Sequence, residues 1–268
     1  MLGFIGAGAM GGAILQGAIN NGYPAGEILL SEAHAGKAQA LAEVTGAWHM
    51  GSNTELVEHV GHGTVILAVK PNIIGTVLDE IAGAAAENST VLVSIAAGTT
   101  LSTLASHLDP AQPIVRVMPN VAAQIGQSMS ALCPNEHVSS EALAAVRSVF
   151  EAVGRVEILA EKDFAAFAAI AGCSPAFTFE YIDAMARAAV ANGLPKSLAV
   201  RIAAQAVVGA ASLVLERDES PANLADLVQS PGGTTVAGVV ALEEAGFGRA
   251  TVKAVQAAID RDIALQGN

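Results

Sequence analysis

A glycine-rich loop close to the start of the chain limits the folds open to it more than any other feature. Residues 6–11 read Gly-Ala-Gly-Ala-Met-Gly and directly follow the apolar run Leu2–Ile5. Residues 12–20 have the pattern of a helix, which Asn21 and Gly22 would end. A strand, a Gly-x-Gly-x-x-Gly loop and a helix in this order are typical of a dinucleotide-binding turn. The chain is therefore predicted to begin as a doubly wound, Rossmann-type α/β domain.

The glycines of this loop have separate predicted roles. Gly6 would form the tight turn, Gly8 would let a pyrophosphate approach the backbone, and Gly11 would let the helix pack against the strand. Ala9 and Met10 complete the predicted cofactor-binding loop. The alternative interpretation of the same residues is a tight strand–helix turn that binds nothing.

The second apolar run, Ile28–Ser31, ends at an acidic residue, Glu32. An acidic side chain at this point can accept a hydrogen bond from a ribose 2′-hydroxyl, which favours NADH. Ser31 and Lys37 could instead hold the 2′-phosphate of NADPH, and Glu32 could be a solvated residue after a strand. The sequence therefore predicts NADPH or NADH as cofactor and leaves the choice open.

Further apolar runs in the first half end in turns of small residues. Such runs are typical of parallel strands covered on both faces, whose carboxyl ends form the ligand-binding edge of open α/β folds. Thr64–Val69 ends at Lys70-Pro71, Val91–Ile95 ends at Ala96-Ala97-Gly98, and Ile114–Val117 leads into Met118-Pro119-Asn120. A helix over Glu141–Val153 and a last strand over Arg155–Leu159 complete the expected domain, residues 1–160.

From residue 161 the periodicity becomes helical and strand-like runs disappear. Helices are predicted over Asp163–Ala171, Pro175–Asn192, Pro195–Leu215, Asn223–Gln229 and Thr234–Ala245. They are rich in alanine and poor in charge, as is typical of helices that bury a face against another subunit. We therefore expect residues 161–268 to form an all-α domain that carries a homodimer interface.

Residues 230–235 read Ser-Pro-Gly-Gly-Thr-Thr and precede one of these helices. A turn of this kind leaves several backbone N–H groups free at the positive end of the helix dipole. Such a helix start can bind a small carboxylate. The alternative is structural, because Thr235 could simply satisfy the helix start and Gly232-Gly233 could be only a loop.

Composition narrows the classes of partner. The formal net charge of −12 makes binding to nucleic acid or to an anionic membrane unexpected. The two cysteines, Cys133 and Cys173, lack metal-ligand spacing, so free thiols and no metal site are expected. No targeting segment is apparent, and a loop interrupts the low-charge stretch Val91–Leu108, so we expect a cytoplasmic protein.

Motifs along nearly the whole chain resemble those of the pyrroline-5-carboxylate reductase family, whose reaction is the last step of proline biosynthesis. The resemblance lies in residues 3–11, in Leu67-Ala68-Val69-Lys70-Pro71, in Ala96-Ala97-Gly98 and in Arg116-Val117-Met118-Pro119-Asn120. It continues in Pro175-Ala176-Phe177, Gly193-Leu194-Pro195, Ala204-Gln205, Gly209-Ala210-Ala211 and residues 230–235. The first motif is shared with many dehydrogenases, whereas the last is quite specific to this family.

The resemblance implies a cofactor domain followed by a helical dimerisation domain, with the active site formed between subunits and dimers that often assemble into larger rings. It implies that Ser230 and the backbone of Gly232, Gly233 and Thr234 hold the carboxylate of pyrroline-5-carboxylate. The Thr235 hydroxyl would hydrogen-bond the ring nitrogen. The nicotinamide would lie near Ala97, Gly98, Met118, Pro119 and Asn120, and Asn53, Ala68, Lys70 and Pro71 would line the rest of the groove.

The sequence departs from the family at two loops. Residues 171–176 read Ala-Gly-Cys-Ser-Pro-Ala where the family usually has Ser-Gly-Ser-Gly-Pro-Ala, and Val121-Ala122 replace the usual Thr-Pro. These changes keep a related imine substrate or a non-catalytic nucleotide-binding paralogue open as alternatives. A β-hydroxyacid dehydrogenase is another, for which Lys162 and Lys196 would be the candidate lysines.

Overall fold

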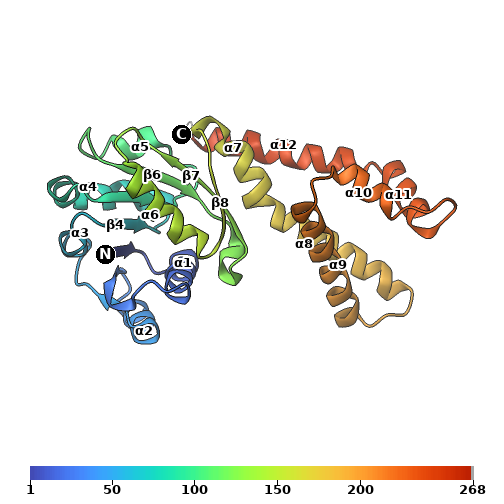
Figure 1. Cartoon of the computed structure of the whole chain (residues 1–268), viewed down its shortest axis with the longest axis horizontal. Helices are drawn as coiled ribbons and strands as arrows, with labels where there is room; N and C mark the ends of the chain where they lie inside the picture. Colours follow the sequence, from blue (N-terminus) through green and yellow to red (C-terminus); the bar gives the residue numbers. More distant parts are fainter. Residues whose placement is uncertain (267–268) are drawn as a thin grey trace. The chain divides into compact units, whose positions relative to one another are not determined.

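The computed structural model describes residues 1–266 of the chain (Figure 1). Within this range the chain divides into two compact units, which are described separately. The first comprises Met1–Gly172 together with the end of the chain from Ile259, and the second comprises Cys173–Ala258. The predicted domain division after residue 160 stays a prediction.

The first unit is built on the predicted doubly wound sheet, which is parallel except for one pair of strands. Within residues 1–266 it contains eight strands in the order β3-β2-β1-β4-β5-β6-β7-β8, and all neighbours are parallel except β6 and β7. The order reverses between β1 and β4, which is the topological switch point where such folds bind ligands. The strands are β1 (Leu2–Ile5), β2 (Ile28–Ser31), β3 (Trp48–His49), β4 (Thr64–Leu67), β5 (Val91–Ser94), β6 (Ile114–Met118), β7 (Ser128–Pro134) and β8 (Gly154–Ile158).

Helices cover both faces of the central strands. Successive residues of one strand point to opposite faces, so Phe4 belongs to one buried cluster and Ile5 to the other. The first cluster also contains the buried side chains of α1 and α6, and the second those of α3 and α4. The helices of this unit are α1 (Ala9–Asn20), α2 (Ala35–Thr45), α3 (Asn53–Val60), α4 (Pro71–Asn88), α5 (Leu101–Ala105), α6 (Ser140–Glu151) and α7 (Phe164–Phe167). Short 3-10 turns lie at Ala25–Glu27 (η1), Val121–Ile125 (η2) and Glu161–Asp163 (η3).

The second unit is helical, as predicted. Its helices are α8 (Ser174–Ala191), α9 (Lys196–Glu216), α10 (Pro221–Leu227), α11 (Thr234–Glu244) and most of α12 (Phe247–Gln266). An ion pair from Lys196 at the start of α9 to Asp183 of α8 ties these two helices together. The Tyr181 and Phe247 rings lie 5.8 Å apart between their centroids.

The chain is helical through residues 172–174, where a loop was predicted between two helices. A π-helix over Ala168–Cys173 (η4) leads directly into α8. The prediction was wrong because Gly172 and Pro175 look like breakers in sequence. Proline at the first turn of α8 removes no needed N–H, since its N–H would have no helical partner there.

Apolar side chains cover much of the second unit. Glu161–Ala191 and Lys196–Glu216 are long and apolar enough to cross a membrane, although only 11% of each apolar window is buried. This is weak evidence for a membrane, because apolar helices of soluble proteins meet the same test. Burial against a second subunit is the alternative explanation of the same surface.

Candidate cofactor and substrate sites

Two neighbouring cavities lie where β1, β2, β4 and β5 end. The Glu32 cavity, of about 390 Å³, is lined by Ile5, Gly6, Gly8, Ser31, Glu32, Ala33, His34, Lys37, Asn53, Ala68, Val69, Lys70, Ile73 and Val77. The Met118 cavity, of about 360 Å³, is lined by Gly8, Ala9, Met10, Ala68, Val69, Lys70, Pro71, Ile95, Ala96, Ala97, Met118 and Pro119. They share Gly8, Ala68, Val69 and Lys70, so they form one groove along the switch point.

The groove gathers most of the predicted cofactor residues. Those that line it are Gly6, Gly8, Ala9, Met10, Ser31, Asn53, Ala68, Lys70, Pro71 and Ala97. Gly11, Gly98 and Asn120 are not among its lining residues. Their contacts with a cofactor stay predictions, like those of the residues that line the groove.

The backbone of the glycine loop explains why three glycines stand there. Gly6 has a φ of +99°, which side chains other than glycine rarely adopt. Gly8 caps α1, and a Cβ added there would meet nothing within 4 Å. A Cβ at Gly11 would lie 2.5 Å from the Gly6 carbonyl oxygen and 2.8 Å from the Ala68 Cβ. Gly11 therefore lets α1 pack closely, and Gly8 leaves open space beside the free N–H groups of a helix start.

Glu32 is fixed beside this loop. Its carboxylate accepts hydrogen bonds from the backbone N–H of Ala7 at 2.8 Å and of His34 at 3.2 Å. Burial opposes the charged form, but these two hydrogen bonds and the charges of His34 and Lys37 hold the pKa of Glu32 below its usual range. A full negative charge therefore stands at the end of β2 near neutral pH.

The neighbouring Ser31 hydroxyl already has a partner for its hydrogen. Ser31 Oγ donates to Asn53 Oδ1 at 2.8 Å, and Asn53 Nδ2 donates to Glu80 Oε2 at 2.8 Å. Asn53 is also the first residue of α3, whose N-cap Ser52 accepts the Glu55 backbone N–H through its hydroxyl at 3.1 Å. Ser31 can therefore accept but not donate a further hydrogen bond while this chain of bonds persists.

Asn120 links the end of β6 to the π-helix. Its Oδ1 accepts from the Ala122 N–H at 3.1 Å, and its Nδ2 donates to the Ala171 carbonyl at 2.9 Å. Its own N–H bonds the Ser128 hydroxyl at 3.2 Å. Asn120 thus contacts both segments that depart from the family pattern, the turn η2 through Ala122 and the π-helix through Ala171.

The Ser-Pro-Gly-Gly-Thr-Thr segment forms the turn at the start of α11. Gly232 has a φ of +70°, and the Gly233 N–H donates to the Ser230 carbonyl at 2.9 Å. Gly233 is the N-cap, and none of the described side chains caps this helix. Thr234 and Thr235 are exposed. The turn thus leaves first-turn N–H groups available to an anion, and the substrate contacts of Ser230, Gly232, Gly233, Thr234 and Thr235 stay predictions.

Comparisons with known proteins identify the family. A model described as pyrroline-5-carboxylate reductase dimerisation matches residues 161–265, and one described as NADP oxidoreductase coenzyme F420-dependent matches residues 1–98. The pyrroline-5-carboxylate reductase of Escherichia coli (strain K12) is 40% identical over 261 residues, which cover 97% of this chain and 96% of that protein. The chain belongs to the pyrroline-5-carboxylate reductase family.

Solved structures of pyrroline-5-carboxylate reductases agree with this assignment. The structure from Coxiella burnetii has a TM-score of 0.93 at 32% identity and covers 98% of this chain and 97% of its own. The Plasmodium falciparum pyrroline carboxylate reductase, solved with NADP bound, has a TM-score of 0.87 at 30% identity, with coverage of 99% and 97%. The predicted family and fold class are therefore confirmed.

Sequence patterns alone did not single out Glu161, which contacts the buried Arg116 of β6. An acidic residue in a polar turn carries no signal of its own. The signal that could have found it is Arg116, a charged residue inside the apolar run Ile114–Met118, because a buried arginine needs a partner.

Proposed function

We propose that the chain catalyses reduction of pyrroline-5-carboxylate to L-proline with NADPH or NADH. The observation that carries the proposal is the pairing of two features in a member of this reductase family. One is the groove at the switch point with the open Gly8 loop, and the other is the uncapped Ser-Pro-Gly-Gly-Thr-Thr helix start. The activity is that of the Escherichia coli relative, which aligns over 97% of this chain.

The groove fits a nicotinamide dinucleotide. Gly8 opens onto empty space at the start of α1, so a pyrophosphate can approach the N–H groups there without meeting a side chain. The Glu32 cavity would take the adenosine half, with Asn53 and Lys70 on its wall, and the Met118 cavity would take the nicotinamide half. The solved relative from Plasmodium falciparum holds NADP.

The bound cofactor would supply the hydride for the imine carbon. The chain's own residues would hold and polarise the substrate. Backbone N–H groups of Gly232, Gly233 and Thr234, with the Ser230 side chain, would bind the carboxylate at the positive end of α11. The Thr235 hydroxyl would hydrogen-bond the ring nitrogen and relay to it a proton that solvent replaces, so that hydride and proton together convert the imine to an amine.

The alternatives have less support from the contacts. Of the two candidate lysines of a β-hydroxyacid dehydrogenase, Lys196 is paired with Asp183, and Lys162 lies exposed in the turn η3 and is not among the residues that line the groove. The altered residues Val121 and Ala122 form a regular turn capped by Asn120, and residues 171–176 are helical, so neither departure leaves a broken loop.

We also propose that the protein is cytoplasmic and that its dimers assemble into larger rings.

The test follows NADPH and NADH oxidation at 340 nm with pyrroline-5-carboxylate and identifies the product as proline. Thr235→Val should lower kcat about 100-fold, because it removes a hydroxyl that assists proton transfer, while cofactor affinity stays unchanged. Thr235→Ser should recover most of the activity. Thr251→Val, which removes an exposed hydroxyl that donates to the Phe247 carbonyl in α12, is the matched control. Full turnover by Thr235→Val would remove Thr235 from the mechanism, and no proline from the wild type would overturn the proposed reaction.

A further inference from the structure

Arg116 is a buried cation in β6, the strand whose last residue, Met118, lines the Met118 cavity. It lies in β6 and is 5% exposed. Its Nη1 contacts Glu161 Oε1 at 2.9 Å, and its guanidinium carbon lies 4.5 Å from the centre of the Phe164 ring. A buried arginine is tolerated only when its charge and hydrogen bonds are matched, and Glu161 supplies the matching charge here.

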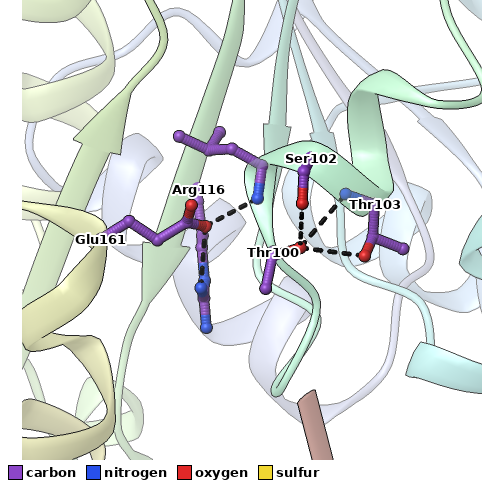
Figure 2. A network of polar contacts seen from close by, with 6 residues as sticks. Thr100, Ser102, Thr103, Arg116 and Glu161 are labelled. Atoms are coloured by element: carbon purple, nitrogen blue, oxygen red, sulfur yellow. Dashed lines mark hydrogen bonds and ion pairs between the residues drawn. The ribbon is translucent and has the colours of Figure 1, made fainter. Parts of the chain in front are cut away.

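The same carboxylate oxygen has a second partner. Glu161 Oε1 accepts the backbone N–H of Leu101, the first residue of α5, at 2.6 Å. The Thr100 hydroxyl caps the same helix start and accepts the Thr103 N–H at 3.1 Å. Figure 2 shows the Glu161 carboxylate beside Arg116 and the Thr100 hydroxyl facing Ser102 and Thr103. Glu161 thus joins β6 and the beginning of α5 through one atom.

The segment held by this contact is the loop 96–100, which follows Ile95 in the connection from β5 to α5. Its first two residues, Ala96 and Ala97, line the Met118 cavity. At the β5 end the Ala96 N–H bonds the Ser94 hydroxyl at 3.3 Å. At the α5 end the Leu101 N–H bonds Glu161. The loop is therefore fixed on both sides, and the second fixed point depends on a side chain from far along the sequence.

Two electropositive groups contact the Glu161 carboxylate. Leu101 presents its N–H at the positive end of α5, and Arg116 adds a full positive charge. The nearby Cys133 thiol stays neutral, because burial and then the charge of Glu161 raise its pKa, despite the opposing effect of Arg116. No thiolate therefore competes for the guanidinium.

We propose that Glu161 is a positioning residue for hydride transfer, which acts by holding the loop 96–100 as the wall of the nicotinamide half of the groove. This inference rests on the proposed placement of the nicotinamide in the Met118 cavity. It adds that a residue of the region matched by the dimerisation model sets the shape of the cofactor groove. Arg116 holds Glu161 in place and touches no reacting atom.

The first test compares two ligands in the full chain with Glu161→Gln. Binding of NADPH should weaken about tenfold and kcat should fall, because the neutral amide oxygen accepts the Leu101 and Arg116 N–H groups more weakly and holds the loop less firmly against the nicotinamide. Binding of 2′-phospho-ADP-ribose, which lacks the nicotinamide, should not change. Glu151→Gln removes the same charge from the exposed Arg147–Glu151 pair and should leave both ligands and turnover unaffected.

A second variant removes only the hydrogen bond. Leu101→Pro deletes the N–H that Glu161 accepts but leaves the Arg116–Glu161 pair intact. Proline is tolerated at the first position of a helix, and Thr100 before it already has the extended backbone, φ −82° and ψ 160°, that a following proline requires. Leu101→Ala gives the baseline for loss of the side chain. Relative to that baseline, Leu101→Pro should reproduce the selective loss of NADPH affinity.

Equal loss of affinity for both ligands would overturn the proposal, since a general loss of structure would affect both halves of the groove. Unchanged NADPH affinity in Leu101→Pro relative to Leu101→Ala would overturn it as well. The proposed function can fail separately. A wild type that makes no proline but shows the selective effect on NADPH binding would refute the reaction and support the positioning role.

Discussion

At the scale of a single residue, the charge on Glu32 determines how the groove discriminates between NADH and NADPH. Its pKa is held low by the Ala7 and His34 N–H groups, and the Ser31 hydroxyl gives its hydrogen to Asn53. A ribose 2′-hydroxyl could donate to this carboxylate, whereas a 2′-phosphate would meet a like charge. These contacts favour the sequence-based interpretation in which Glu32 binds a ribose over the one in which Ser31 holds a phosphate.

We therefore expect Glu32→Gln to raise the ratio of kcat/KM for NADPH to that for NADH about tenfold, because it removes a charge of the same sign as the phosphate. The same ratio in the wild type should rise as the pH falls through the lowered pKa of Glu32, where the carboxylate takes up a proton. Steady-state kinetics with both cofactors measures both effects. Glu87→Gln, an exposed residue near the end of α4, is the control. A ratio that does not move in Glu32→Gln would mean that Glu32 does not face the 2′ position.

At the scale of elements, sequence predicts best where one physical signal dominates. The continuous apolar runs of β1, β2, β4 and β5 were placed to within two residues, because strands buried on both faces must be apolar throughout. Strand β7 was missed, since its buried Ser128 and Ser130 interrupt the run and satisfy each other at 3.2 Å. The helical continuation through residues 172–174 was missed, and the bond from Asn120 to the Ala171 carbonyl that holds this segment comes from far along the sequence. Glu161 was missed for the same reason, because its partners Leu101 and Arg116 are also far away in the sequence.

The packing of α1 against the sheet gives a prediction at this scale. Gly11→Ala should lower the free energy of unfolding by about 1–3 kcal/mol, because its Cβ would overlap the Gly6 carbonyl and Ala68. Gly12→Ala, whose Cβ would meet its nearest atoms at 4.0 Å, should be neutral or stabilising. Gly8→Ala should keep full stability and lose cofactor affinity, since its methyl group would enter the groove. Urea unfolding and cofactor titration separate these cases, and equal stability of Gly11→Ala and Gly12→Ala would contradict the packing argument.

At the scale of the whole molecule, the apolar surface of the second unit requires a partner. Ile202, Val208 and Leu215 of α9 are 52%, 56% and 62% exposed in the single chain. The region from residue 161 matches a dimerisation domain, which accounts for such a surface in a protein with a strongly acidic charge balance. Membrane insertion would also explain exposed apolar side chains, but it would not explain the match to a dimerisation domain.

Val208→Glu should therefore convert the dimer to a monomer, because it would bury a charge without a partner in the interface. Light scattering coupled to size exclusion measures the mass, and masses above a dimer in the wild type would reveal the proposed ring. Arg201→Glu, which changes an exposed charge on the same helix, is the control and should keep the dimer. Turnover should fall with the dimer if, as the family resemblance implies, each active site draws on two subunits. A monomeric wild type, or a Val208→Glu variant that stays dimeric, would show that α9 does not form the interface.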